Sequence, residues 1–103
     1  MAKKILQINL RLNISAERLK EEFEHAAVPI AKVSGLTWKI FGIEEERSEA
    51  CGIYFFEDNK SLEAYIESPI MDRMKTLEFF SDITMKTFDC VEDASAITRG
   101  PVK

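Results

Sequence analysis

The sequence contains few residues of the kinds that build metal sites and disulfide frameworks. Its 103 residues include two cysteines and one histidine. Cys51 and Cys90 lack the short paired spacing of zinc ligands, and one pair of cysteines is too few for a disulfide framework. We therefore expect two reduced thiols and no metal site.

Long apolar runs and an excess of basic residues are also missing. No run approaches the roughly 20 apolar residues of a membrane-spanning helix, and the N-terminal segment alternates after Ile5, unlike the apolar block of a signal peptide. Fourteen Lys and Arg residues against 18 Asp and Glu residues leave a net charge of -4, whereas phosphate binding needs a concentrated basic surface. These absences predict a cytoplasmic protein that binds neither nucleic acid nor membrane.

Motifs for cofactors and for activated nucleophiles are absent as well. The chain has four glycines, and none belongs to a Gly-rich phosphate loop or to a G-x-S-x-G nucleophile turn. We therefore expect no bound cofactor, and the sequence identifies no catalytic residue. A role as base is not expected for His25, because it lies away from the apolar stripe of its helix, on a flank that is usually solvated.

The composition is that of one compact domain spanning residues 1–103. Hydrophobic residues make up 46% of the chain and charged residues 31%, which is the balance of an ordinary globular protein. Residues 5–12 alternate between apolar and polar side chains, as a strand does when one face is buried. This pattern predicts a first strand with Leu6, Ile8, Leu10 and Leu12 on one face and Gln7, Asn9 and Arg11 on the other.

Helix and strand signals then follow one another along the chain. Ser15 is suited to cap a helix whose apolar residues recur at helical spacing up to Val33, and Gly35 ends that helix. Residues 36–45 and 50–57 have the pattern of two strands joined in a long hairpin.

The second half of the chain repeats the order of helix and strand. A second helix begins at Asp58 and breaks at Pro69, where a new turn can start because proline is favoured at the first helical position. A fourth strand is expected over residues 83–91, and the sequence leaves open whether residues 94–103 form a flexible tail. The order βαββαβ predicts an α+β, ferredoxin-like fold, with two helices on one face of a four-stranded antiparallel sheet.

The face of the sheet that the helices leave bare is expected to meet a second copy of the chain. Both strands of the hairpin carry apolar residues on both faces, for example Trp38 and Phe41 in the first strand and Tyr54 and Phe55 in the second. Soluble monomers seldom expose an apolar patch of more than a few hundred Å². We therefore expect a homodimer through the sheet faces.

An RNA-recognition module uses the same strand order but presents aromatic residues to bases. Its motifs would fall on the first and third strands. Cys51 stands where that module needs a basic residue, and Leu6 and Ile53 stand where stacking aromatics belong. This alternative is therefore disfavoured.

Several stretches together resemble one known family, and the resemblance covers nearly the whole chain. They are Leu-Gln-Ile-Asn-Leu at 6–10, Gly-Leu-Thr-Trp-Lys at 35–39, Cys-Gly-Ile-Tyr-Phe-Phe-Glu-Asp-Asn-Lys-Ser at 51–61 with Ala-Tyr at 64–65, and Phe-Asp at 88–89. The chain is similar to the YdhR family of putative monooxygenases. The resemblance implies a dimeric α+β barrel in which two sheets close on each other, with a ligand cleft in each subunit between the sheet and the helices.

The resemblance also implies a function, namely monooxygenation of a small aromatic or quinol-like substrate. With no cofactor expected, the substrate itself must react with oxygen as a phenolate or enolate. Because fold alone does not determine a reaction, two alternatives stay open. One is a non-catalytic dimer that binds a small ligand, and the other is an isomerase or lyase on the same fold.

Six residues are candidates for substrate binding, each with a plainer alternative. The amides of Gln7 and Asn9 are suited to hold a substrate carbonyl or hydroxyl group, or they form an exposed polar face. Trp38 and Tyr54 bracket an aromatic ligand or belong to the core. The remaining two lie near the cleft mouth, or serve as a packed tyrosine and a surface arginine: Tyr65 and Arg73.

Overall fold

The computed structural model describes residues 2–103 and contains four strands and four helices. The first half holds β1 (Lys4–Leu12), α1 (Ala16–Ile30), β2 (Leu36–Glu44) and β3 (Glu49–Phe56). The second half holds α2 (Asn59–Ile66), α3 (Pro69–Thr76), β4 (Phe80–Asp89) and α4 (Glu92–Ile97).

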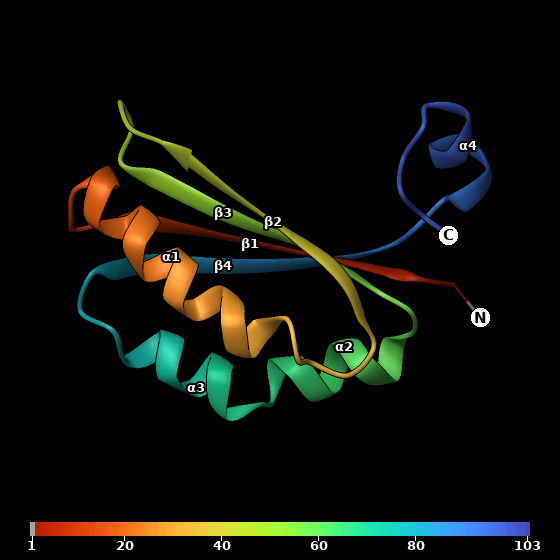
Figure 1. The fold of residues 1–103 in the computed structure, drawn as a ribbon, viewed down its shortest axis with the longest axis horizontal. Helices are drawn as coiled ribbons and strands as arrows, with labels where there is room; N and C mark the ends of the chain where they lie inside the picture. Colours follow the sequence, from red (N-terminus) through yellow and green to blue (C-terminus); the bar gives the residue numbers. More distant parts are fainter. Residues whose placement is uncertain (1) are drawn as a thin grey trace.

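The strands form one antiparallel sheet in the order β2-β3-β1-β4, and α1, α2 and α3 cover one of its faces (Figure 1). The ferredoxin-like prediction is confirmed. The second expected helix is divided into α2 and α3, and α4 is an additional short helix. No helix between residues 2 and 103 combines the length and the apolar character needed to cross a membrane.

Short polar residues start the helices as their chemistry predicts. The Ser15 hydroxyl accepts a hydrogen bond from the Arg18 N–H at the start of α1. Asp58 accepts one from the Ser61 N–H at 2.8 Å, which begins α2. Proline is the first residue of α3, a position at which the backbone N–H group that proline lacks would form no hydrogen bond within the helix.

The side chains of β1 that were predicted to be apolar on one face form the centre of the core. Leu6 and Ile8 are 0% and 2% exposed and pack with Tyr54 and Phe56 of β3 against the helices. The face of the sheet that carries Leu6 is therefore the helix-covered face. The residues of β2 and β3 that stand in register with Leu6, and every second residue from them, point to the same face. Ile5, Gln7 and Asn9 point to the opposite, open face.

A β-bulge sets which side of β2 faces the helices. The register of β2 against β3 shifts between Leu36 and Trp38, so that Leu36 pairs with Phe56 and Trp38 with Phe55. Beyond the bulge the strand alternates regularly. Lys39, Phe41 and Ile43 consequently point to the helix-covered face, and Trp38 and Ile40 to the open face.

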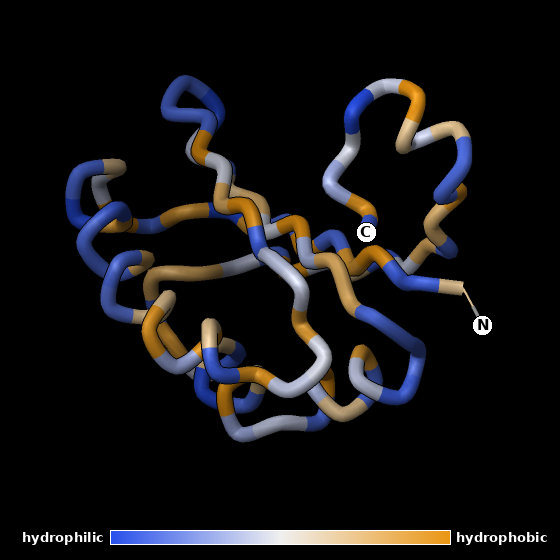
Figure 2. The backbone as a smooth tube through the Cα atoms, turned by 45° about the vertical axis from the view of Figure 1, so that its right-hand side comes forward, coloured by the Kyte–Doolittle hydropathy of each residue, from blue (hydrophilic) through white to orange (hydrophobic). Residues whose placement is uncertain are grey.

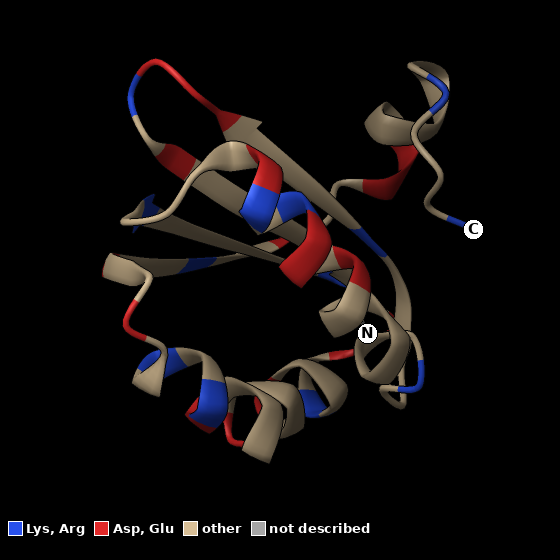
Figure 3. Ribbon diagram, turned by 60° about the vertical axis from the view of Figure 1, so that its left-hand side comes forward, with Lys and Arg blue, Asp and Glu red and all other residues tan. Residues whose placement is uncertain are grey.

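The turn between β2 and β3 projects away from the body of the domain and is mostly acidic (Figures 2 and 3). All residues from Glu44 to Glu49 are exposed, and they include four glutamates. Ser48 closes the turn with a φ of 51°. The tip is therefore solvated, as the sequence predicts.

The C-terminal segment folds back onto one end of the open face. Trp38 Nε1 donates a hydrogen bond to the Pro101 carbonyl at 2.8 Å, and Lys3 Nζ donates one to the Val102 carbonyl at 2.7 Å. Val102 packs with Phe55 and Cys90 in a small buried cluster. This end of the open face is thus covered by the chain itself, while Ile40 remains 55% exposed.

Candidate functional site

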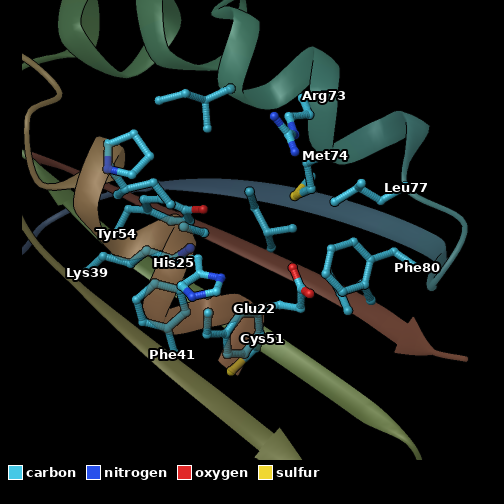
Figure 4. Close-up of a pocket in the computed structure, with 18 of the residues that line it drawn as sticks. Glu22, His25, Lys39, Phe41, Cys51, Tyr54, Arg73, Met74, Leu77 and Phe80 are labelled. Atoms are coloured by element: carbon cyan, nitrogen blue, oxygen red, sulfur yellow. The ribbon is translucent and has the colours of Figure 1, made fainter. Parts of the chain in front are cut away.

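A cleft of about 300 Å³ lies between the helix-covered face of the sheet and the helices (Figure 4). Ile8, Phe41 and Tyr54 form its floor on the sheet. Its walls are formed by Phe23 and Ala26 of α1 and by residues of α3, of the loop after it and of the start of β4, namely Ile70, Met74, Leu77, Phe79 and Phe80. Its surface is predominantly apolar and aromatic, which suits a planar hydrophobic ligand.

Polar groups occur in two places in the cleft. Lys39 and Tyr54 of the sheet and Tyr65 of α2 are half-buried or buried. Arg73 extends from α3 on one side of the cleft, and Glu22 and His25 of α1 lie across from it (Figure 4). Arg73 and His25 are exposed, so they mark the solvent side of the cleft.

Lys39 lies with its amine against two aromatic rings. Its Nζ atom is 3.8 Å from the ring centroid of Phe41 and 4.5 Å from that of Tyr54. Burial lowers the pKa of Lys39 to about 7, and the negative charge of an ionised Cys51 would act in the opposite direction. The faces of the two rings also favour the ammonium form, because their quadrupoles attract a cation.

Gly52 makes room for the side chain of Lys39. Gly52 pairs with Phe41 on the neighbouring strand, so its missing side chain would stand on the helix-covered face. A Cβ atom there would lie 2.9 Å from Cε of Lys39, closer than such atoms approach in proteins. The absence of a side chain at this position allows the amine to reach the ring of Tyr54.

Tyr54 and Tyr65 form a buried hydroxyl pair beside the amine. Tyr65 Oη donates a hydrogen bond to Tyr54 Oη at 2.9 Å, and the ring centroids are 5.0 Å apart. Burial is the largest cause that raises the pKa of both phenols above the ordinary value. Both are therefore neutral hydrogen-bond donors at physiological pH.

The hydroxyl groups of Tyr54 and Tyr65 are expected to contribute to the free energy of unfolding as a coupled pair. Tyr54→Phe should lower the free energy of unfolding by about 1–3 kcal/mol, because it leaves a buried hydroxyl group of Tyr65 without its partner. The double variant with Tyr65→Phe should cost less than the sum of the two single substitutions. Urea denaturation of the four proteins measures this; strictly additive costs would show that the two hydroxyl groups do not depend on each other.

The structure brings three of the six predicted site residues together. Tyr54, Tyr65 and Arg73 all line the cleft. Gln7, Asn9 and Trp38 do not, because they lie on the open face of the sheet.

The expected placement of Asn9 and Trp38 in the cleft between sheet and helices was therefore wrong. The two residues do share a face, since Asn9 pairs with Cys51 and Trp38 with Phe55, but it is the open one. The physical reason is that the apolar residues of β1 are buried beneath the helices. A cleft on that side must be lined by the same face as the core, and the polar residues of β1 point away from it.

Lys39 is the cleft residue that the sequence analysis missed. The signal available was its position two residues before Phe41, on the same face of β2 as an inward-pointing aromatic residue. Lysine on a buried face is rare. Among residues 2–103, no cluster of three or more His, Cys, Asp or Glu side chains has the arrangement of a metal site.

Several solved structures have the same fold at low sequence identity. SnoaB, a cofactor-independent oxygenase from Streptomyces nogalater, is 12% identical, with a TM-score of 0.71 over 87% of this chain and 94% of that chain. A putative antibiotic biosynthesis monooxygenase from Deinococcus radiodurans is 15% identical, with a TM-score of 0.65 over 84% and 91%. A protein from Shewanella oneidensis is 7% identical, with a TM-score of 0.73 over 86% and 91%.

Sequence comparison gives a family but no individual relative. No curated protein sequence matches the chain. The family model described as "Putative mono-oxygenase ydhR" matches residues 5–101, which is nearly the full length. The chain therefore belongs to the YdhR family of putative mono-oxygenases.

Proposed function

We propose that the protein is a cofactor-independent monooxygenase that acts on a small aromatic or quinol-like substrate in the cleft between sheet and helices. The observation that carries the proposal is the cleft itself. It offers aromatic and aliphatic walls, an amine and two neutral phenols within a volume of about 300 Å³. The family to which the chain belongs and the description of SnoaB as a cofactor-independent oxygenase support the choice of reaction.

The reaction balances without a cofactor because the substrate supplies the electrons. A phenol or enolisable ketone loses a proton and becomes a phenolate or enolate, which transfers one electron to O₂. The two resulting radicals combine to form a C–O bond and a peroxide. Loss of water from the peroxide leaves a new carbonyl group. A CH₂ group plus O₂ thus becomes a C=O group plus H₂O, with one oxygen atom in each product.

The protein orients the substrate, excludes water from it and donates hydrogen bonds to it. Phe23 and Phe41 have their ring centroids 4.8 Å apart and provide flat apolar surface beside the ligand. The hydroxyl group of Tyr54 borders the cleft and is placed to donate a hydrogen bond to the oxygen atom on which negative charge develops. Exclusion of water favours electron transfer to O₂ over proton return from solvent.

Oxygen consumption by the purified protein tests the proposal. A panel of naphthoquinols and anthrones is supplied to protein without added metal, flavin, haem or nicotinamide. We expect saturable O₂ uptake above the spontaneous rate for at least one compound. Saturable binding without O₂ uptake favours the non-catalytic alternative, and product formation that needs no O₂ favours an isomerase or lyase.

The proposal includes a homodimer through the open faces of the sheets. Ile40 and Phe88 are 55% and 47% exposed on this face, and Ile5 and Ile53 lie between them on the neighbouring strands. A self-complementary surface of this kind suits a two-fold interface. The radius of gyration, 14.0 Å, exceeds the value of about 13 Å for a compact domain of this length. The hairpin of β2 and β3 projects from the body of the domain and is available to contact a second subunit (Figure 1).

A further inference from the structure

Lys39 is the only amine among the described residues that line the cleft, and it has no ionic partner there. None of the ion pairs formed by residues 2–103 includes it. A buried lysine without a carboxylate is costly as a cation and gives up its proton readily. The group is therefore available to accept a proton from a ligand.

The groups that face Lys39 come from every element packed around the cleft. Tyr54 belongs to β3 and Tyr65 to α2, whereas the thiol of Cys51 points to the opposite face of the sheet. Glu22 and His25 face the same cleft from α1, and Arg73 from α3. The two rings within 4.5 Å of the amine, those of Phe41 and Tyr54, are the neighbours that respond to its charge most directly.

We propose that Lys39 is the general base of the cleft, and that the faces of Phe41 and Tyr54 hold its ammonium form after it takes a proton from the ligand. The inference rests on the proposed function for the oxidation that follows, and it deepens that function by naming the base. The neutral amine accepts the proton of a ligand O–H group, or of a C–H group beside a carbonyl. The electron pair of the broken bond stays on the ligand as a phenolate or enolate.

The arrangement also restricts the class of ligand. The acidic group must reach an amine on the sheet side of the cleft, and the charge that develops must lie near the hydroxyl of Tyr54. A planar phenol or an enolisable aryl ketone meets both requirements. The ammonium ion that forms is stabilised by the two rings and by the new anion, so proton transfer does not leave an isolated charge in an apolar cavity.

Binding of 4-nitrophenol tests proton transfer without any oxidation. This probe changes its visible absorption on ionisation, and its own pKa lies near neutrality. At about pH 7, where part of the Lys39 amine is neutral, we expect the fraction bound to the wild-type protein to show more phenolate absorption than the free probe does. The fraction bound to Lys39→Met should show the neutral spectrum. Identical bound spectra for the two proteins would overturn the inference.

Gly52→Ala provides a positional variant that keeps the lysine. The added methyl group would lie 2.9 Å from Cε of Lys39, near the end of a flexible side chain, and 3.1 Å from Cε1 of Tyr54. We expect the strand to remain folded while the amine moves from the rings. The phenolate signal should fall as it does in Lys39→Met. Lys39→Arg keeps a cation that does not give up its proton. A phenolate signal that survives in this variant at full strength would show that charge, and not base chemistry, is responsible.

A titration without ligand separates this inference from the proposed function. In NMR spectra of protein labelled at lysine Cε, the signal lost in Lys39→Met should titrate near pH 7 in the wild-type protein. An ordinary lysine titration would overturn the inference. Proton transfer to Lys39 without O₂ uptake from any substrate would instead refute the oxygenase proposal alone. With a turned-over substrate, Lys39→Met should lower kcat/KM by about 10²–10⁴-fold and remove its rise with pH through about 7.

Discussion

Ala26→Phe is expected to abolish ligand binding in the cleft while leaving the protein folded. Ala26 lies on α1 and lines the cleft, so a phenyl ring at this position enters the space that a ligand would occupy. We expect the affinity for a naphthoquinol or for 4-nitrophenol to fall by more than about 100-fold, which corresponds to about 2.8 kcal/mol. Fluorescence or absorbance titration measures the loss.

Ala27→Phe is the matched control for this substitution. It introduces the same ring at the next position of the same helix, where the residue does not line the cleft. The cost in helix propensity is the same for both variants, at about half a kcal/mol. Equal affinity in wild type and Ala26→Phe, with both folded, would place the ligand elsewhere on the molecule.

Ile40→Asp is expected to turn the proposed dimer into folded monomers. Ile40 is 55% exposed in the single chain, so the charge is solvated in the monomer and costs little there. In a dimer through the open faces it would be buried without a partner, and it would enter a two-fold interface twice. We expect the dissociation constant to rise by more than about 100-fold, as measured by sedimentation equilibrium or light scattering.

Val28→Asp controls for the added charge. Val28 is 61% exposed on α1 and lies outside the open face of the sheet. It should leave the dimer and its thermal unfolding unchanged. A wild-type protein that is monomeric at micromolar concentration would refute the proposed interface, as would an Ile40→Asp variant that remains fully dimeric.

The arrangement of strands and helices followed from local chemistry and was predictable. The alternation in β1 correctly separated the buried side chains, such as Leu6 and Ile8, from Gln7 and Asn9. The start of α3 at a proline was also predictable, because the proline ring fixes the backbone angle that a first helical residue needs. These features depend on residues close together in the sequence.

The site was less predictable, because it depends on which face of each strand meets the helices. The bulge between Leu36 and Trp38 sets that choice for β2, and nothing in the sequence marks it. Once the register is known, Lys39 and Phe41 must share the cleft. Placing Asn9 and Trp38 there required the polar face of β1 to lie under the helices, which would have exposed its leucines to water.

The C-terminal segment shows a second limit of local reasoning. Its hydrogen bonds join residues far apart in sequence, such as Trp38 with Pro101 and Lys3 with Val102. The short α4 has no side-chain cap at its start. It buries none of its own residues, and the contacts with the open face are made by Pro101 and Val102, which follow it.

Isotope labelling tests the central claim, oxygenation by O₂ in a cofactor-free cleft, most directly. The purified protein is supplied with ¹⁸O₂ and with a substrate from the naphthoquinol and anthrone panel, and the product is analysed by mass spectrometry. We expect one ¹⁸O atom in each product molecule, formed at a rate that Ala26→Phe abolishes and Ala27→Phe preserves. A product without any ¹⁸O would contradict the proposed oxygenation. The same ¹⁸O content and rate for the Ala26→Phe variant as for the wild-type protein would contradict the proposed site.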